Sequence, residues 1–151
     1  MIEIQKIDHI GIRVHEEARA VSFYESLGFK VEWRSTFEKG HPIIMKHPCG
    51  IAINILGPAN QPASDNILQD VKPKYAGFTH MALKVKSLTE TESFMNENQI
   101  KITERLKFGT LNAFFVRDPD GNVIEFDEYP GDDPDTRQGH EQTENLTNHP
   151  D

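Results

Sequence analysis

Two histidines, one glutamate and one asparagine occupy positions at which their side chains could bind a metal ion. His9 and His80 are 71 residues apart, and so are Asn54 and Glu125. Two imidazoles and one carboxylate, with the remaining coordination positions open, form the ligand set of many divalent transition metal sites. Asn54 is expected to be a weaker fourth group, which binds through its amide oxygen or holds a water molecule. Iron, cobalt, nickel and zinc suit such ligands better than calcium does.

Each of these residues also has a simpler interpretation. A lone histidine opposite an apolar strand face is usually a solvated residue, and a lone glutamate is usually a surface charge. Chance does not readily place two histidines at one position of a repeat and a glutamate at a second shared position. The pattern therefore favours a metal site over isolated surface residues.

The same spacing relates most of the chain to itself. Residues 7–14, IDHIGIRV, align with residues 78–85, FTHMALKV, and residues 20–31 align with residues 91–102. The segments HPCG and DPDG, which start at His47 and Asp118, also align. One ungapped offset accounts for all of these matches, so the sequence predicts two copies of one structural unit.

Each copy is predicted to fold as a β-α-β-β-β module, which makes the chain an α+β protein. Alternating hydrophobic residues predict the strands, and Gly28 is expected to stop the first helix. The predicted elements of the first copy are a strand at 8–14, a helix at 16–27 and strands at 30–37, 42–47 and 51–56. Those of the second copy are a strand at 78–85, a helix at 88–97 and strands at 100–108, 111–117 and 122–128.

The modules are expected to cover residues 1–57 and 73–129. A linker at 58–72 separates them, with a short helical turn near Ile67 and Leu68. Residues 130–151 form a polar, acidic tail that has too few hydrophobic side chains to offset the entropy of ordering.

Strand alternation predicts which face carries the four candidate ligands. Ile10, Ile12 and Val14 should face the helix, which places His9 on the opposite, concave face. The same parity puts Asn54, His80 and Glu125 on that face, while the core receives Ile53, Ile55, Met81, Leu83, Val85, Ile124 and Phe126. Arg13 and Lys84 share the concave parity. They are either solvated residues or a cationic rim that attracts an anionic substrate.

Composition excludes several classes of partner. The net charge of −8 argues against nucleic acid and anionic membranes, since both require a basic face. No apolar run approaches the roughly 18 residues of a membrane span. Cys49 is the only cysteine, so no internal disulfide can form, which fits a reducing cytoplasm. A small-molecule substrate is the expected partner.

The motifs together resemble the vicinal oxygen chelate superfamily, which contains glyoxalase I, extradiol dioxygenases, methylmalonyl-CoA epimerase and the fosfomycin- and bleomycin-resistance proteins. The resemblance covers about residues 4–129 and rests on DHIGI, FYESLGF and DPDGNVIEF. It implies paired βαβββ modules whose sheets form an open, curved mixed sheet around one metal. Its ligand positions fall on His9, Asn54, His80 and Glu125. Small members commonly form homodimers, often with shared metal sites.

Asn54 departs from the glyoxalase I pattern, in which this position is typically a glutamate. The resemblance implies a metal-dependent oxidoreductase of the dioxygenase type, whose two-histidine, one-glutamate set His9, His80 and Glu125 satisfy. Glyoxalase I (lactoylglutathione lyase) and epimerase-type proton transfer, with Glu125 as catalytic base, remain alternatives. A metal-free bleomycin-type binder and a fosfomycin-type thiol transferase are further alternatives.

Dioxygenases of the resembled family also need an acid/base residue near the metal. The candidates in this chain are His41, His47 and Tyr129, each of which is otherwise a loop or strand-end residue. His15, His140 and His149 are expected to have no role.

Overall fold

The structure, a computed structural model, describes residues 1–62 and 65–131. The chain divides into two compact units. Unit 1 contains Met1–Lys74 and also Asp118–Asn122, whereas unit 2 contains Tyr75–Arg117 and the described residues from Val123 onward. Of the predicted tail, residues 132–151 lie outside the described part.

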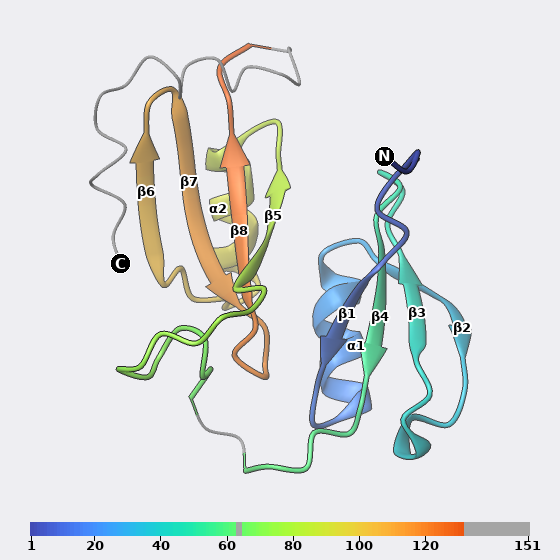
Figure 1. Cartoon of the computed structure of the whole chain (residues 1–151). Helices are drawn as coiled ribbons and strands as arrows, with labels where there is room; N and C mark the ends of the chain where they lie inside the picture. The colour runs from blue at the N-terminus through green and yellow to red at the C-terminus, as the bar shows by residue number, and fades with distance from the viewer. Residues whose placement is uncertain (63–64, 132–151) are drawn as a thin grey trace. The chain divides into compact units, whose positions relative to one another are not determined.

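Unit 1 contains the first βαβββ module (Figure 1). Its elements are β1 (Ile10–Arg13), α1 (Glu17–Ser26), β2 (Lys30–Arg34), the short 3-10 helix η1 (Phe37–Lys39), β3 (Ile43–Lys46) and β4 (Ala52–Leu56). The sheet has the order β1-β4-β3-β2, with β1 and β4 parallel and the other pairs antiparallel. Helix α1 covers one face of this sheet.

Unit 2 repeats this arrangement. Its elements are β5 (His80–Lys84), α2 (Leu88–Glu97), β6 (Glu104–Phe108), β7 (Leu111–Arg117) and β8 (Val123–Glu128). The order β5-β8-β7-β6 has the same mixture of parallel and antiparallel pairs as unit 1. The predicted α+β fold of two βαβββ modules is therefore confirmed, and each module is a four-stranded, open mixed sheet.

Burial follows the predicted strand parity most closely in unit 1. Ile12 is 8% exposed, and the side chains of Val14, Ile53 and Ile55 are fully buried against the helix side of the sheet. In unit 2, β8 buries Ile124 and Phe126, whereas Met81, Leu83 and Val85 are only half-buried. The core strands of unit 2 are therefore β7 and β8, and β5 lies at the edge of its sheet.

Every strand except β7 is shorter than predicted, and β2 and β6 show how the difference arises. β2 ends at Arg34, and Phe37 instead starts η1 and packs its buried ring on Gly57, where an added Cβ would lie 2.0 Å from the ring. β6 begins at Glu104, because residues 100–103 connect it to the end of α2. Both predictions followed strand propensity. In the structure, packing sets the conformation of the segment after β2, and the end of α2 sets that of the segment before β6.

The repeated Pro-x-Gly segments both form turns. Gly50 and Gly121 have φ values of +103° and +83°, a conformation that side chains with a Cβ rarely adopt. In the linker, the predicted helical turn near Ile67 and Leu68 is also confirmed, since the amide of Asp70 donates to the carbonyl of Asn66 at 2.7 Å. No helix in the described ranges is long and apolar enough to cross a bilayer.

Candidate functional site

In unit 2, His80 and Glu125 lie on one face of the sheet, opposite the buried core. His80 is the first residue of β5, and Glu125 is in the middle of β8. The parallel register pairs His80 with Val123 and Ala82 with Glu125, so the two side chains are neighbours along the same face. The Nε2 atom of His80 is 3.7 Å from Oε1 of Glu125.

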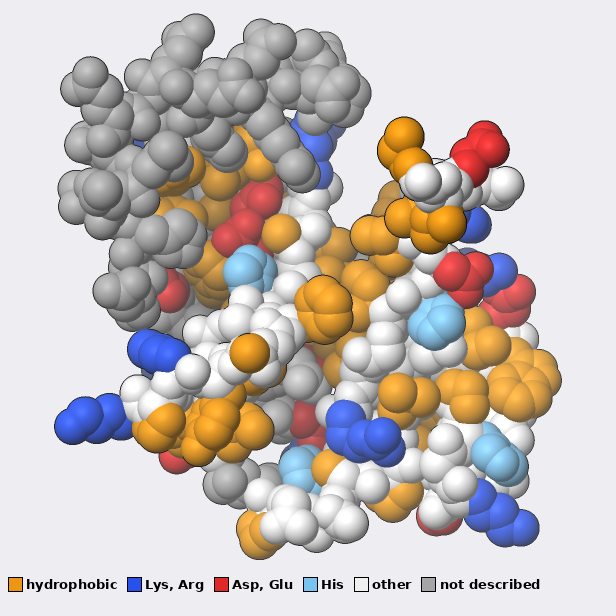
Figure 2. Space-filling view, viewed as in Figure 1, with side chains coloured by type: hydrophobic (Ala, Val, Ile, Leu, Met, Phe, Trp, Pro, Cys, Tyr) orange, Lys and Arg blue, Asp and Glu red, His pale blue; other side chains and the backbone are white. Residues whose placement is uncertain are grey.

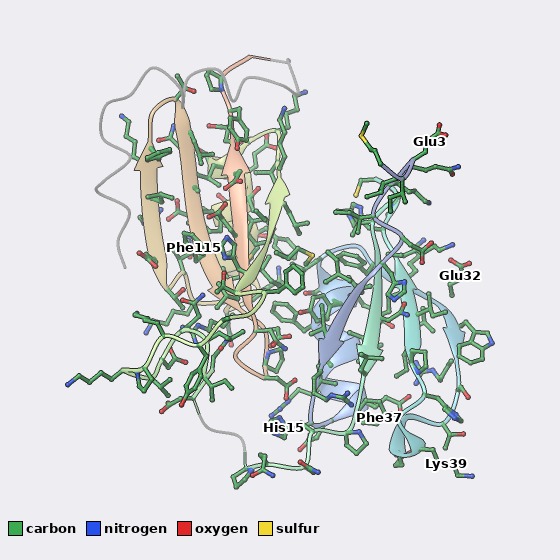
Figure 3. All side chains as sticks on the ribbon, in the orientation of Figure 1. Glu3, His15, Glu32, Phe37, Lys39 and Phe115 are labelled. Atoms are coloured by element: carbon green, nitrogen blue, oxygen red, sulfur yellow. The ribbon has the colours of Figure 1, made fainter. Side chains whose placement is uncertain are left out.

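The two side chains of this pair have different surroundings. Glu125 is 8% exposed although it carries a carboxylate. Phe115 on β7, labelled in Figure 3, lies opposite Glu125 in the sheet register, and its ring centroid is 5.7 Å from that of His80. Thr79 Oγ1 is 2.8 Å from Nδ1 of His80. A buried carboxylate is stable when a cation or a hydrogen-bond donor faces it, so this position favours a cationic partner.

In unit 1, His9 and Asn54 occupy the equivalent positions. His9 directly precedes β1, and Asn54 lies in β4 beside Gly11, which has no side chain. Nδ1 of His9 is 2.7 Å from Oδ2 of Asp8. The hydrogen bond with His9 lowers the pKa of Asp8 below its usual value. His9 is exposed and Asn54 is half-buried.

The donor atoms fit a divalent transition metal. Two atoms that each lie about 2.1 Å from one metal ion are about 3.0–3.4 Å apart in octahedral or tetrahedral geometry. The separation of 3.7 Å between His80 and Glu125 therefore requires only a small side-chain adjustment. Within the described ranges, no cluster of three or more His, Cys, Asp or Glu side chains that could hold a metal is present. Each unit by itself thus provides two of the four predicted groups.

The two predicted rim residues end β1, which directly follows His9, and β5, which begins with His80. Arg13 is the last residue of β1 and is exposed, and its carbonyl accepts a hydrogen bond from Asn122. Lys84 is the last residue of β5, and its Nζ atom lies 5.6 Å from the ring centroid of Tyr129. Lys84 and Tyr129, one of the three acid/base candidates, therefore contact each other in unit 2.

The other two acid/base candidates lie in loops of unit 1. His41 is exposed, with Nδ1 3.3 Å from Ser35 Oγ. His47 accepts a hydrogen bond from the amide of Cys49, packs its ring against Phe29, and lies so close to Gly28 that an added Cβ there would be 2.9 Å from Nε2. These contacts give His47 a structural role in the first Pro-x-Gly turn.

His15, which was expected to have no role in the chemistry, has a structural role in unit 1. Asp120 Oδ1 accepts hydrogen bonds from the amide of His15 at 2.9 Å, from Nδ1 of His15 at 2.7 Å and from Arg19 at 2.9 Å. Nε2 of His15 is 2.8 Å from the carbonyl oxygen of Gln61. The bond to Asp120, followed by the contact with Gln61, raises the pKa of His15. His140 and His149 lie outside the described residues.

The turn Asp118–Asn122, which contains Asp120, has a second buried carboxylate in unit 1. Asp118 is 4% exposed and accepts hydrogen bonds from Tyr24, from the amides of Asp120 and Asn122, and from the side chain of Asn122. Burial raises the pKa of Asp118, although these hydrogen bonds act in the opposite direction, and burial also raises the pKa of Tyr24. The DPDGN sequence was the available signal, since aspartates in turns often bond to backbone amides.

Comparisons with known proteins agree with this architecture. A family profile described as the glyoxalase/bleomycin resistance protein/dioxygenase superfamily matches residues 6–126. A curated protein of Mycosarcoma maydis, the glyoxalase domain-containing protein RDO1, is 26% identical over 132 residues, which is 85% of this chain and 70% of that protein.

Solved structures show the same fold. The glyoxalase family protein from Enterococcus faecalis has 25% identity and a TM-score of 0.64, with 82% of this chain and 98% of that chain covered. A glyoxalase/dioxygenase from Nostoc punctiforme has 21% identity and a TM-score of 0.65, with 84% and 92% covered.

Proposed function

Because the chain belongs to the glyoxalase/bleomycin resistance protein/dioxygenase superfamily, we propose that it is a metal-dependent enzyme for a small substrate with two adjacent oxygen atoms. Its metal ligands are His9, His80 and Glu125, with Asn54 as a weak or water-mediated fourth group. The metal is iron, cobalt, nickel or zinc. The two-histidine, one-glutamate set favours dioxygenase-like chemistry. The main support is the pair formed by His80 Nε2 and the buried Glu125 Oε1 at 3.7 Å.

When bound, a divalent metal supplies Lewis-acid stabilisation for negative charge on substrate oxygens. The residues of the chain have separate tasks. Glu125 and His80 provide adjacent donor atoms on one sheet face, and the ring of Phe115 packs against the imidazole of His80. Lys84 and Arg13 are the last residues of β5 and β1, where cationic side chains attract an anionic substrate.

Proton transfer is the alternative reaction for the same residues. In that case Glu125 is the base that takes a proton from the substrate carbon, as in glyoxalase I or an epimerase. Its place on the sheet face beside His80 supports this task, because a general base must lie within reach of the substrate that the metal holds. A metal-free binding protein of the bleomycin-resistance type would need neither the pair of His80 and Glu125 nor the metal.

The chain is proposed to act in the cytoplasm as a homodimer. Support for assembly comes from exposed apolar side chains, because monomers rarely leave large apolar patches in contact with water. Ile2, Ile4 and Ile7 are each more than three-quarters exposed, and Trp33 is half-exposed. Hydrophobic side chains also gather over the visible face of the unit 1 sheet in Figure 2, the face opposite α1 on which Trp33, Ile44 and Leu56 lie.

Metal analysis by mass spectrometry tests the proposal, on protein purified without added metal or chelator. Iron supports oxygenation, whereas nickel, cobalt or zinc supports proton transfer. The His80→Ala variant should lose stoichiometric metal, and the His41→Ala variant, which removes an exposed histidine of a loop, should retain it. Absence of metal from the unmodified protein, or full occupancy in His80→Ala, would contradict the assigned ligands.

A further inference from the structure

The residue that precedes each candidate histidine contacts the Nδ1 atom of that histidine. Asp8 Oδ2 is 2.7 Å from Nδ1 of His9, and Thr79 Oγ1 is 2.8 Å from Nδ1 of His80. Asp8 and Thr79 are themselves 71 residues apart. Both modules therefore occupy Nδ1 and leave Nε2 as the ring atom available to a ligand.

Asp8 determines the tautomer of His9. A neutral imidazole carries one hydrogen, on either Nδ1 or Nε2, and an ionised carboxylate only accepts hydrogen bonds. The hydrogen must then lie on Nδ1, which donates to Asp8, and Nε2 keeps its lone pair. His9 is thus in the form that binds a metal through Nε2 before any metal arrives.

Thr79 does not impose a tautomer on His80. A hydroxyl both donates and accepts, so it satisfies Nδ1 whether or not that nitrogen carries the hydrogen. Nε2 of His80 is 3.7 Å from Oε1 of Glu125, which is longer than a hydrogen bond, so this contact does not fix the hydrogen of His80 either. His80 can bind a cation through Nε2 only after the hydrogen is on Nδ1 and donates to Thr79.

We propose that Asp8 and Thr79 are positioning residues with different tasks: Asp8 fixes His9 in its metal-binding form, and Thr79 lets His80 change tautomer when a metal binds. This inference rests on the proposed metal site. Asn54 brings no negative charge to the metal. Asp8 compensates for this through His9, because a carboxylate bonded to a metal-binding imidazole makes that imidazole a stronger ligand.

Histidine NMR of ¹⁵N-labelled, metal-free protein tests the tautomers without reference to activity. In the unmodified protein, His9 should carry its hydrogen on Nδ1. His80 should populate both tautomers without metal and should carry its hydrogen on Nδ1 after titration with Zn²⁺. In Asp8→Ala, the Nδ1–H form of His9 should lose its predominance. Asp8→Thr copies the partner of His80 and should leave both tautomers of His9 populated.

Zn²⁺ affinity provides the second measurement. Asp8→Ala should weaken binding about tenfold, the lower end of the range for such outer partners, because the Asp8 side chain is 85% exposed and water competes for it. Thr79→Val keeps the side-chain shape and should weaken binding less. Glu3→Ala is the matched control, since Glu3 (Figure 3) is an exposed acidic residue of the same N-terminal segment, and it should leave affinity and tautomers unchanged.

The outcomes separate this inference from the proposed function. If the unmodified protein does not bind Zn²⁺ or any other divalent metal, the metal site is wrong, and with it the assigned task of both residues. If the protein binds Zn²⁺ but His9 carries its hydrogen on Nε2 in the metal-free state, the role of Asp8 is wrong. Equal affinity and tautomers in Asp8→Ala and the unmodified protein would also overturn it.

Discussion

The hydroxyl of Tyr24 donates a hydrogen bond of 2.7 Å to Oδ2 of Asp118, although 94 residues separate them in the sequence. Both residues belong to unit 1, because the turn Asp118–Asn122 is part of that unit. Tyr24 is fully buried on α1, and Asp118 is 4% exposed. The first module therefore includes a turn that the second module's sequence encodes.

Removal of this hydroxyl should destabilise the protein. Tyr24→Phe leaves the buried carboxylate of Asp118 with one donor fewer, at a cost of about 1–3 kcal/mol. Urea denaturation should show a lower midpoint with an unchanged slope. Tyr75→Phe is the matched control, because Tyr75 is 56% exposed, and its effect should stay within about 0.5 kcal/mol. Equal stability of the two variants would mean that the Tyr24 hydrogen bond contributes nothing.

The ion pair of His15 and Asp120 should make stability depend on pH. The folded-state pKa of His15 is raised, so its stabilising contribution is complete below the unfolded value of about 6.5 and disappears as pH rises through the folded value. His15→Asn should therefore lower the melting temperature more at about pH 5.5 than at about pH 9. The control His41→Asn should show no such trend. If the loss of melting temperature in His15→Asn grew as pH rose, the ion pair would not be the source of the pH dependence.

Asn54→Glu should strengthen metal binding. The change adds a carboxylate beside Gly11, where the neighbouring strand has no side chain. We expect binding tighter by about tenfold or more, which corresponds to about 1.4 kcal/mol, and a gain in glyoxalase activity. Asn54→Gln lengthens the side chain without adding charge and should show neither effect. Rapid turnover of the methylglyoxal–glutathione hemithioacetal by the unmodified protein would favour glyoxalase I instead.

The proposed homodimer makes a prediction about which chain supplies each ligand. We expect His9 and Asn54 from one protomer and His80 and Glu125 from its partner. When His9→Ala and His80→Ala proteins are mixed, each mixed dimer then has one site with both changes and one intact site. Random exchange should restore metal to about a quarter of the sites.

Two results would contradict this arrangement. If both pairs of ligands come from one chain, every site in a mixed dimer keeps one change, and no metal binding returns. A molecular mass equal to that of one chain, measured by light scattering at micromolar concentration, would exclude the dimer itself. Mixing His41→Ala protein with His80→Ala protein is the control for exchange alone, because His41 is not a proposed ligand.

Local sequence patterns determined the modules and much of the core. The spacing of 71 residues predicted the repeat, and α2 and β7 have the predicted bounds. Alternation correctly placed Val14, Ile53 and Ile124 in the core, because a strand with one buried face has hydrophobic residues at every second position. The family resemblance, carried by the same motifs, was confirmed by the profile match. The metal ligands and the rim residues stay predictions.

Tertiary structure alone decided how polar groups pair over long sequence distances. No periodicity joins Tyr24 to Asp118 or His15 to Asp120, because such hydrogen bonds depend on which turn reaches which helix and not on local alternation. The end of β2 was likewise decided by the packing of Phe37 on Gly57. The sequence by itself could give the chemistry of each side chain and the face on which it lies, whereas burial and partners depend on contacts between segments that are distant in the chain.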